Sequence, residues 1–338
     1  AKYAVAVSNA TAALHIACLS AGLKKDEIVW TSPNTFVASA NCALYCGGKV
    51  DFVDINEFTY NMDVTLLEEK LKNAEIKPKI VIPVHFAGQS CEMEKIHELS
   101  KKYGFKIIED ASHAIGAEYK KVKVGSCKYS DMTVFSFHPV KIITTGEGGM
   151  VLTNDEELYE KLKLYRSHGV TRNKLLMKNN SDEPWYYEQI DLGFNYRITD
   201  MQAALGKSQM DRLDEFVDRR RVLAKQYDEL LKDTKVITPY QDANTKSSWH
   251  LYVIKIDFQN INISKKELFK LMKEKGIILN LHYIPVHTQP YYKNLGFEKG
   301  DFPNSEKYYE DVITIPLFYD LTDQEQIYIV ECFKEVLK

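Results

Sequence analysis

The sequence has no long apolar run, no marked excess of charge and no cysteine pattern typical of a disulfide framework. Its longest apolar stretches, such as 80–84, have the length of a strand, so none can span a bilayer. There are 44 Lys and Arg against 47 Asp and Glu, and the formal charge of −3 argues against a nucleic-acid or anionic-membrane partner. The six cysteines include no CxxC pair, so we expect buried thiols and a reducing compartment, the cytoplasm.

The composition is that of a folded chain. Its 338 residues suffice for about two domains. Hydrophobic residues at 45% and charged residues at 27% exclude a largely disordered chain. The sequence begins at Ala1 without a Met and enters a β-rich run within a few residues, so we expect that an N-terminal portion is missing from it.

The first half of the chain alternates β-rich runs with helix-length segments. The predicted strands lie at 3–7, 28–31, 49–53, 80–84, 105–109, 132–136 and 149–153. This alternation predicts an α/β fold with βαβ crossovers and a mainly parallel sheet. Ligands bind at the carboxyl ends of the strands in such sheets, so the residues that follow each strand are the candidates for function.

The second half has a different texture. A long, highly charged helical stretch is predicted from about Asp200 to Lys232, and residues 171–190 before it are predicted to form a long polar loop. A smaller α+β unit follows, with strands at 251–256 and 279–283, a helix at 265–275 and a last helix from Thr322. We therefore expect a large domain at 1–205 and a small C-terminal domain at 206–338 that includes the long connecting helix.

Two of the strand ends carry small or acidic residues. The turn at 8–13 (SNATAA) opens a helix whose free N–H groups and Thr11 hydroxyl could hold a phosphate, although alone it is more simply an ordinary N-cap. Asp110 ends a buried strand and His113 follows three residues later. A carboxylate at that place requires a cationic or hydrogen-bonding partner, but capping of the next helix explains Asp110 equally well.

A lysine follows another buried strand. Lys141 lies five residues after Ser136 and just before a glycine-rich return at 146–149. Desolvation would lower its pKa and supply the neutral amine that attacks a carbonyl, although a single lysine is more often a solvated surface residue. Taken together, the phosphate turn, the Asp with its His, and the Ser with its Lys suit pyridoxal 5'-phosphate (PLP).

The motifs in this order resemble the DegT/DnrJ/EryC1 family of PLP-dependent sugar-nucleotide aminotransferases. The resemblance covers essentially the whole chain and includes 8–12, 34–36, 84–88, 109–113, 137–149, 166–169 and 193–206. It implies the fold type I (aspartate aminotransferase-like) architecture, with a mainly parallel seven-stranded sheet and a small C-terminal α+β domain.

The resemblance also implies roles for single residues. Lys141 forms the Schiff base and moves the proton, Asp110 holds the pyridine nitrogen protonated, and His113 contacts the O3′ oxygen of the ring. Phe36 stacks on the ring, although without the family a core aromatic would be the better interpretation. The remaining cofactor residues are Thr11, Ala12 and Ser136 at the phosphate, and Asn195, which reaches the cofactor of the partner subunit in a homodimer.

The resemblance extends to the substrate. His282 and Tyr283 are candidate substrate contacts or, equally, the end of a buried strand, and Arg197 is a carboxylate or phosphate ligand or an interface residue. Residues 184–193 (PWYYEQIDLG) resemble the branch that aminates UDP-2-acetamido-2,6-dideoxy-β-L-arabino-hexos-4-ulose with L-glutamate, giving 2-oxoglutarate, on the route to pseudaminic acid for flagellin glycosylation.

Other functions remain open on the sequence alone. The chain could aminate another nucleotide-linked 4-keto or 3-keto sugar, or it could be a non-catalytic PLP-binding regulatory protein. A sugar 3-dehydratase of the same fold would carry His in place of Lys141. A nicotinamide-dependent enzyme would need GxGxxG after the first strand, which 8–13 does not provide. The nine histidines are spread out, so we expect no metal.

Overall fold

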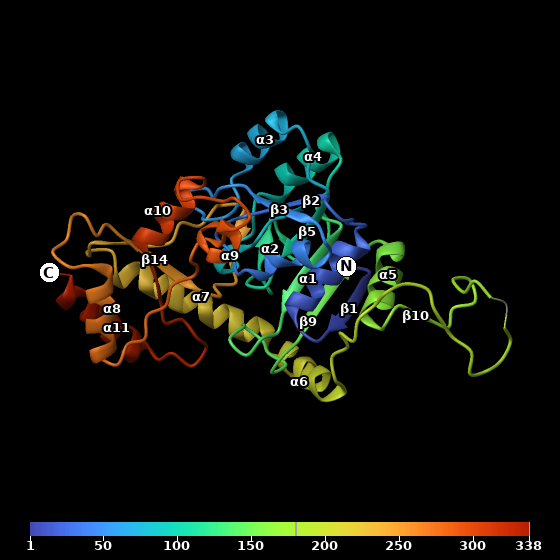
Figure 1. The fold of residues 1–338 in the computed structure, drawn as a ribbon. Coiled ribbons are helices and arrows are strands. Elements are labelled where there is room, and N and C mark those ends of the chain that lie inside the picture. Colours follow the sequence, from blue (N-terminus) through green and yellow to red (C-terminus); the bar gives the residue numbers. More distant parts are fainter. Residues whose placement is uncertain (180, 338) are drawn as a thin grey trace.

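The centre of the molecule is a seven-stranded sheet in the order β1–β9–β8–β5–β4–β2–β3 (Figure 1). The computed structural model describes residues 1–179 and 181–337. The strands are β1 (Tyr3–Val7), β2 (Ile28–Thr31), β3 (Lys49–Phe52), β4 (Ile80–Ile82), β5 (Lys106–Asp110), β8 (Met132–Ser136) and β9 (Gly149–Thr153). Only β9 among them runs antiparallel to its two neighbours, β1 and β8. The predicted strands and the mainly parallel sheet are thus confirmed.

Helices cover both faces of this sheet. One face is packed by α1 (Ala10–Ser20), α2 (Ala38–Tyr45) and α5 (Glu156–Arg166), and the other by α3 (Val64–Asn73) and α4 (Met93–Tyr103). Each face of the sheet forms a hydrophobic core with its helices, and successive strand residues point alternately into one core and the other. Ile108 packs in the core with α1 and α2, and Ile107 packs in the core with α3 and α4. By the same alternation, Asp110 faces α1 and α2, and Glu109 faces the opposite side.

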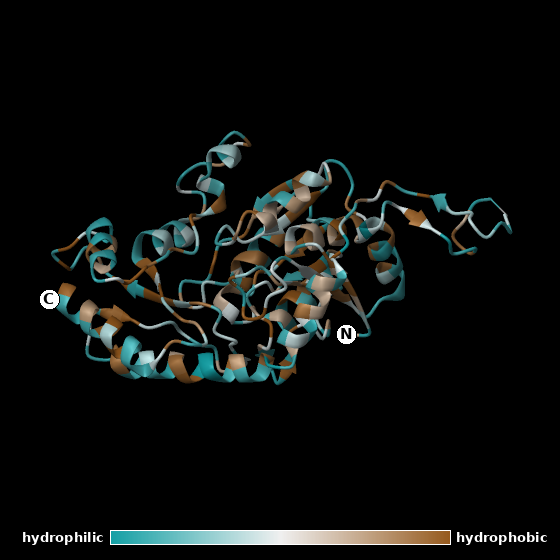
Figure 2. Ribbon diagram, turned by 90° about the horizontal axis from the view of Figure 1, so that it is seen from below, coloured by the Kyte–Doolittle hydropathy of each residue, from teal (hydrophilic) through white to brown (hydrophobic). Residues whose placement is uncertain are grey.

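The polar segment predicted as a loop is an arm with a short ladder at its base. Strands β10 (Val170–Thr171) and β11 (Glu188–Gln189) pair antiparallel, and the described residues between them, 172–179 and 181–187, project from the body in both ribbon views (Figures 1 and 2). Large apolar side chains are exposed on it, with Leu175 at 92% and Trp185 at 69%.

The predicted long helix is two helices, α6 (Asp200–Met210) and α7 (Leu213–Leu230). Three strands, β12 (Val236–Ile237), β14 (Tyr252–Ile256) and β15 (Val312–Ile315), form the C-terminal sheet. Around it lie α8 (Lys265–Glu274), α9 (Pro290–Lys293), α10 (Pro303–Asp311) and α11 (Asp323–Val336). A third small sheet joins β6 (Glu118–Tyr119), β7 (Val122–Lys123) and β13 (Thr245–Lys246). The domain boundary at 205/206 stays a prediction.

The strand predicted at 279–283 is wrong. Asn280 alone forms an isolated bridge, with Thr314 of β15, so the run lies beside β15 without forming a strand of the C-terminal sheet. The main chain that follows bonds to the loop after β2 instead: Tyr283 N–H donates to Asn34 Oδ1 at 3.3 Å and Val286 N–H to Pro33 O at 2.9 Å. This segment, hereafter the crossing segment, therefore runs from the C-terminal sheet to the carboxyl end of β2 in the large sheet.

The helices carry hydrophilic and hydrophobic residues together (Figure 2). Within residues 1–179 and 181–337, none is long and apolar enough to cross a bilayer. Every residue of α6 is at least partly exposed, with Met201 at 82% and Leu205 at 43%. Exposed apolar side chains thus lie on α6 as well as on the arm.

Candidate active site

A cavity of about 320 Å³ opens at the carboxyl ends of the central strands. Most of the predicted site residues meet in its lining, namely Thr11, Phe36, Asp110, His113, Ser136, Lys141, His282 and Tyr283. The first six come from strand ends and helix starts of the large sheet, and the last two from the segment that crosses over from the C-terminal sheet. The sheet and the crossing segment thus bring together residues that are up to 272 positions apart in the chain (11 to 283).

One end of the cavity is the N-terminus of α1. The Asn9 side chain caps this 11-residue helix by accepting the Ala12 N–H at 2.8 Å. A Cβ on Gly149 would lie 2.6 Å from the Asn9 carbonyl carbon and 2.7 Å from the Ala10 nitrogen, so the turn is packed too closely for any other residue there. Such a helix start, with the hydroxyls of Thr11 and Ser136 in the same cavity, is suited to a phosphate.

Ala12 is placed differently from the other predicted phosphate residues. It is 4% exposed, lies outside the lining of the cavity, and has its N–H bonded to Asn9. A phosphate contact through Ala12 would have to compete with this helix cap, so its role stays a prediction.

Asp110 is held by one hydroxyl group from α2 and by one main-chain N–H. Ser39 Oγ donates to Asp110 Oδ2 at 2.6 Å, and Ser112 N–H donates to Oδ1 at 3.1 Å. Because an ionised carboxylate only accepts, Ser39 uses its proton on Asp110 and accepts from Thr35, 2.8 Å away. Asp110 is only 5% exposed, so this chain of donors fixes a negative charge where a cationic nitrogen could bind.

Neither Ser39 nor Thr35 was predicted as a site residue, although Thr35 lies in the motif at 34–36. Both are almost fully buried, at 0% and 2% exposure. Their spacing of four residues, one helical turn next to the predicted stacking residue Phe36, is the signal that could have identified them.

Lys141 is the only one of the predicted residues that supplies an amine. Burial lowers its pKa to about 8, although the charge of Asp110 acts in the opposite direction. The neutral form, which is the nucleophile, is therefore well populated near neutral pH, as the sequence analysis anticipated for a lysine at this place.

In the protein freed of PLP, we expect the reaction of Lys141 with an amine-directed acylating reagent to follow this lowered pKa. The rate should rise with pH and reach half its maximum near pH 8, because deprotonation of the amine creates the nucleophile. An unperturbed lysine has a pKa of about 10.4. Mass spectrometry of the Lys141 peptide after timed labelling measures the profile. A midpoint above pH 10 would contradict the burial described here.

The imidazole of His113 is neutral and oriented from both sides. Ala87 N–H donates to Nδ1 at 3.3 Å, so we assign the ring proton to Nε2, which faces the Tyr283 hydroxyl at 3.0 Å. Burial, followed by the charge of Lys141, lowers its pKa well below the usual value. Both ring nitrogens of His113 thus have partners within the chain, and the predicted contact with O3′ stays a prediction.

The crossing segment forms a further wall. Burial and then the charge of Lys141 lower the pKa of His282 to about 4, and its Nδ1 lies 3.0 Å from Thr314 Oγ1. Burial raises the pKa of Tyr283, so both side chains are uncharged near neutral pH. They contribute hydrogen-bonding groups to the cavity without adding charge to it.

Three predicted residues differ in exposure from the rest. The Phe36 ring lines the cavity but is 58% exposed, which leaves a face open for stacking. Asn195 and Arg197 are exposed and lie outside the lining. For Asn195 this agrees with a target on another subunit, and for both residues the roles stay predictions.

These groups fit pyridoxal phosphate by their chemistry. The helix start accepts an anion, the Asp110 carboxylate accepts a cationic ring nitrogen, the Phe36 face accepts an aromatic ring, and Lys141 is an amine for a carbonyl. The fit rests on the donor set and on the pKa of Lys141, and it does not depend on the sequence motifs.

Comparison with known proteins agrees with this chemistry. A family model described as the DegT/DnrJ/EryC1/StrS aminotransferase family matches residues 1–334. A Campylobacter jejuni relative named UDP-4-amino-4,6-dideoxy-N-acetyl-beta-L-altrosamine transaminase is 38% identical over 100% of this chain and 86% of its own length.

Solved structures give the same result. Helicobacter pylori PseC, an aminotransferase involved in the biosynthesis of pseudoaminic acid, superimposes with a TM-score of 0.89 at 32% identity, over 99% of this chain and 87% of that one. The PLP form of the Streptococcus pneumoniae protein Spr1654 superimposes with a TM-score of 0.87 at 29% identity, over 98% and 86%.

Proposed function

Because the chain belongs to the DegT/DnrJ/EryC1/StrS aminotransferase family and is a PLP-dependent sugar aminotransferase, we propose that it moves the amino group of L-glutamate to C4 of a UDP-linked 4-keto-6-deoxyhexose. The observation that carries this proposal is Lys141, an amine with a pKa lowered to about 8 in one cavity with Asp110 and the start of α1. Asp110 and the start of α1 would bind the cofactor, and Lys141 would transfer the proton.

The residues of the cavity have separate tasks. Pyridoxal phosphate, when bound, supplies the electron sink and carries the amino group between the two substrates. The start of α1, with Thr11 and Ser136, binds the phosphate, and Asp110 keeps the ring nitrogen protonated. Lys141 takes the α-proton of glutamate and later returns a proton to C4 of the sugar, a task for a positioned base with a tuned pKa.

The proposed sugar is UDP-2-acetamido-2,6-dideoxy-β-L-arabino-hexos-4-ulose, and the proposed pathway is pseudaminic acid biosynthesis for flagellin glycosylation. Support comes from the name of the Campylobacter jejuni relative and from the resemblance of residues 184–193 to that branch. Another nucleotide-linked keto sugar is the second candidate, because 184–193 lies on the projecting arm and at its base, outside the lining of the cavity.

We infer that the working unit is a homodimer with shared active sites. The exposed apolar side chains of the arm and of α6 need a partner surface, and a second copy of this chain offers one. Asn195 lies just beyond the base of the arm, where an isolated bridge joins it to Ser167. Asn195 is therefore next to the arm, which would contact the other subunit.

A mixed dimer tests this arrangement. We expect Asn195→Ala dimers and Lys141→Ala dimers to be nearly inactive alone, and their mixture to recover up to about a quarter of the wild-type activity. Random exchange makes about half of the dimers mixed, and each mixed dimer has one intact site. The controls are the two variants unmixed and their masses in solution. A mixture that recovers nothing, although the subunits exchange, would contradict sharing through Asn195.

A titration with L-glutamate tests the function itself. We expect the visible absorption band of the PLP-loaded protein to bleach with excess L-glutamate and to return when the proposed UDP-4-keto sugar is added. Borohydride reduction before glutamate should place the cofactor on Lys141 in peptide mapping. A band that glutamate does not change would indicate another amino donor or a non-catalytic PLP-binding protein. If the band returns only with other nucleotide-linked keto sugars, the proposed substrate is wrong and one of those sugars takes its place.

A further inference from the structure

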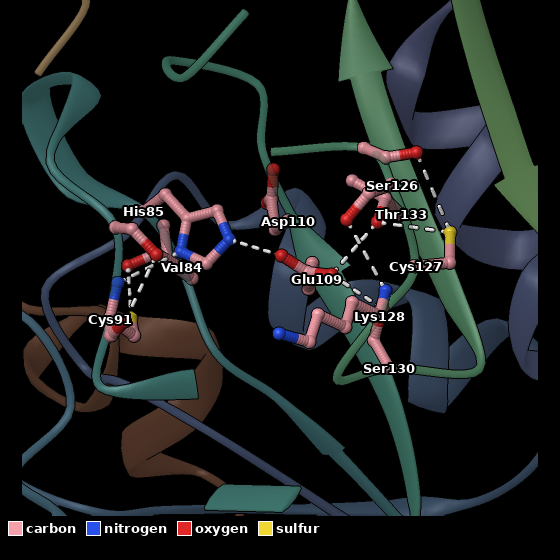
Figure 3. Close-up of polar contacts among 12 residues, drawn as sticks. Val84, His85, Cys91, Glu109, Asp110, Ser126, Cys127, Lys128, Ser130 and Thr133 are labelled. Carbon is pink, nitrogen blue, oxygen red and sulfur yellow. Dashed lines mark hydrogen bonds and ion pairs between the residues drawn. The ribbon is translucent and has the colours of Figure 1, made fainter. Parts of the chain in front are cut away.

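A buried histidine–glutamate pair lies directly behind the active site, and the function proposed above does not use it. His85 and Glu109 are 0% and 5% exposed, and His85 Nε2 lies 2.6 Å from Glu109 Oε2 (Figure 3). The other carboxylate oxygen accepts hydrogen bonds from Ser130 and, at 2.9 Å, from Thr133. A carboxylate this deeply buried is costly unless it is bonded in this way, so the pair calls for an explanation.

The protons of the pair follow from its donors. Cys91 N–H donates to His85 Nδ1 at 3.1 Å, so we assign the ring proton to Nε2, from which it is donated to Glu109. Burial raises the pKa of the Glu109 carboxyl, but the bonds from His85, Ser130 and Thr133 outweigh burial and lower that pKa below its usual value. Glu109 is therefore an anion that accepts from three side chains.

The pair is joined to Asp110 through the main chain. His85 N–H donates to Asp110 O at 3.0 Å, and Asp110 N–H donates to Pro83 O at 2.9 Å. Glu109 and Asp110 are neighbours on β5, so their side chains point to opposite faces of the sheet. On one face of the sheet, Glu109 of β5 is hydrogen-bonded to Thr133 of β8 and to His85, which follows β4. Asp110, the next residue of β5, points into the cavity on the other face.

The pair also supports the turn that contacts His113. The 3₁₀ turn Phe86–Gly88 follows His85 directly, and Ala87 in it has φ of +56°, a conformation unfavourable for a residue with a Cβ. Its N–H is the group that selects the tautomer of His113. His85, bonded through its main-chain N–H and both ring nitrogens, anchors the start of this turn.

We propose that Glu109 and His85 are positioning residues of the active site, which hold the Asp110 carboxylate and the His113 ring in the orientation that bound pyridoxal phosphate requires. They act through the main chain and lie outside the lining of the cavity. The inference rests on the proposed function, since it assumes that Asp110 and His113 meet the cofactor. Residues behind a first layer of ligands commonly control how well that layer binds.

Glu109→Leu tests the proposal against a matched control in the same chain. A second histidine–glutamate pair, His287 Nε2 and Glu306 Oε1 at 2.9 Å, joins a buried imidazole to a carboxylate that is 12% exposed. It lies outside the cavity lining, so Glu306→Leu removes a similar interaction. We expect both variants to unfold at a lower temperature. Only Glu109→Leu should weaken PLP binding, about tenfold, which is the change that roughly 1.4 kcal/mol produces. Absorbance titration of the apo proteins measures the affinity.

A folded Glu109→Leu variant that binds PLP as tightly as the wild type would overturn the proposal. An equal loss of affinity in Glu306→Leu would overturn it as well, because the effect would then be one of general stability. A wild-type chain that does not bind PLP would be a failure of the proposed function, and the titration shows this before any variant is compared.

If Glu109→Leu does not fold, a pair of substitutions at His85 replaces it. A Gln places its amide near the position of Nε2 and can still donate to Glu109, whereas an Asn reaches only the position of Nδ1 and keeps the bond from Cys91. We expect PLP affinity close to that of the wild type in His85→Gln and about tenfold weaker in His85→Asn. Equal affinities in these two variants would overturn the proposal.

Discussion

Replacing Lys141 by alanine is expected to lower the rate of transamination by about 10⁴-fold or more, because one positioned acid–base group alone contributes roughly 10²–10⁴-fold and this lysine is also the nucleophile. The fold should persist, since the side chain reaches into a cavity and fills no part of the packed cores. Single-turnover conversion of L-glutamate to 2-oxoglutarate measures the loss, and the thermal midpoint measures the fold.

Lys265 provides the control for this prediction. Burial lowers its pKa to about 8 as well, and its Nζ donates to Tyr309 O at 2.5 Å, but it lies on α8, outside the lining of the cavity. Lys265→Ala should therefore keep the activity of the wild type. Wild-type rates in Lys141→Ala would refute the assignment of the site, whereas loss of activity in both variants would mean that their folding had failed.

The large sheet could be predicted from the sequence because its strands are short apolar runs bounded by turns and separated by helix-length segments. Once a parallel sheet is assumed, the carboxyl ends of its strands must lie at one edge, and this alone brings Asp110 close to Lys141. The resemblance to a known family added the roles of these residues, which spacing does not determine.

The parts that could not be predicted depend on contacts between distant segments. The run at 279–283 has strand-like composition, but its main chain bonds to Pro33 and Asn34, far away in the sequence. Ser39 and His85 are ordinary residues of a helix and a turn until the fold places them beside Asp110 and Glu109. Hydrogen-bond partners of this kind become visible only in three dimensions.

Asp110→Asn is expected to lower the turnover number about 10²–10³-fold and to weaken PLP binding, since removing one member of a buried charge pair costs roughly 3–5 kcal/mol. The amide keeps the shape of the side chain but cannot hold a ring nitrogen protonated. Its NH₂ group must also face the Ser39 hydroxyl or the Ser112 N–H, both of which donate to the carboxylate now. Stopped-flow kinetics with L-glutamate and PLP titration measure the two effects.

The matched control is Asp54, a second buried carboxylate. It is 7% exposed and accepts hydrogen bonds from the main-chain N–H groups of Asn304 and Ser305, away from the cavity lining. Asp54→Asn should cost stability without changing PLP affinity. In Asp110→Asn the pKa of Lys141 should also fall below about 8, because the charge of Asp110 raises it now, so acylation of Lys141 should become faster at pH 7. A slower acylation, or unchanged turnover, would show that Asp110 is not the charge that controls this site.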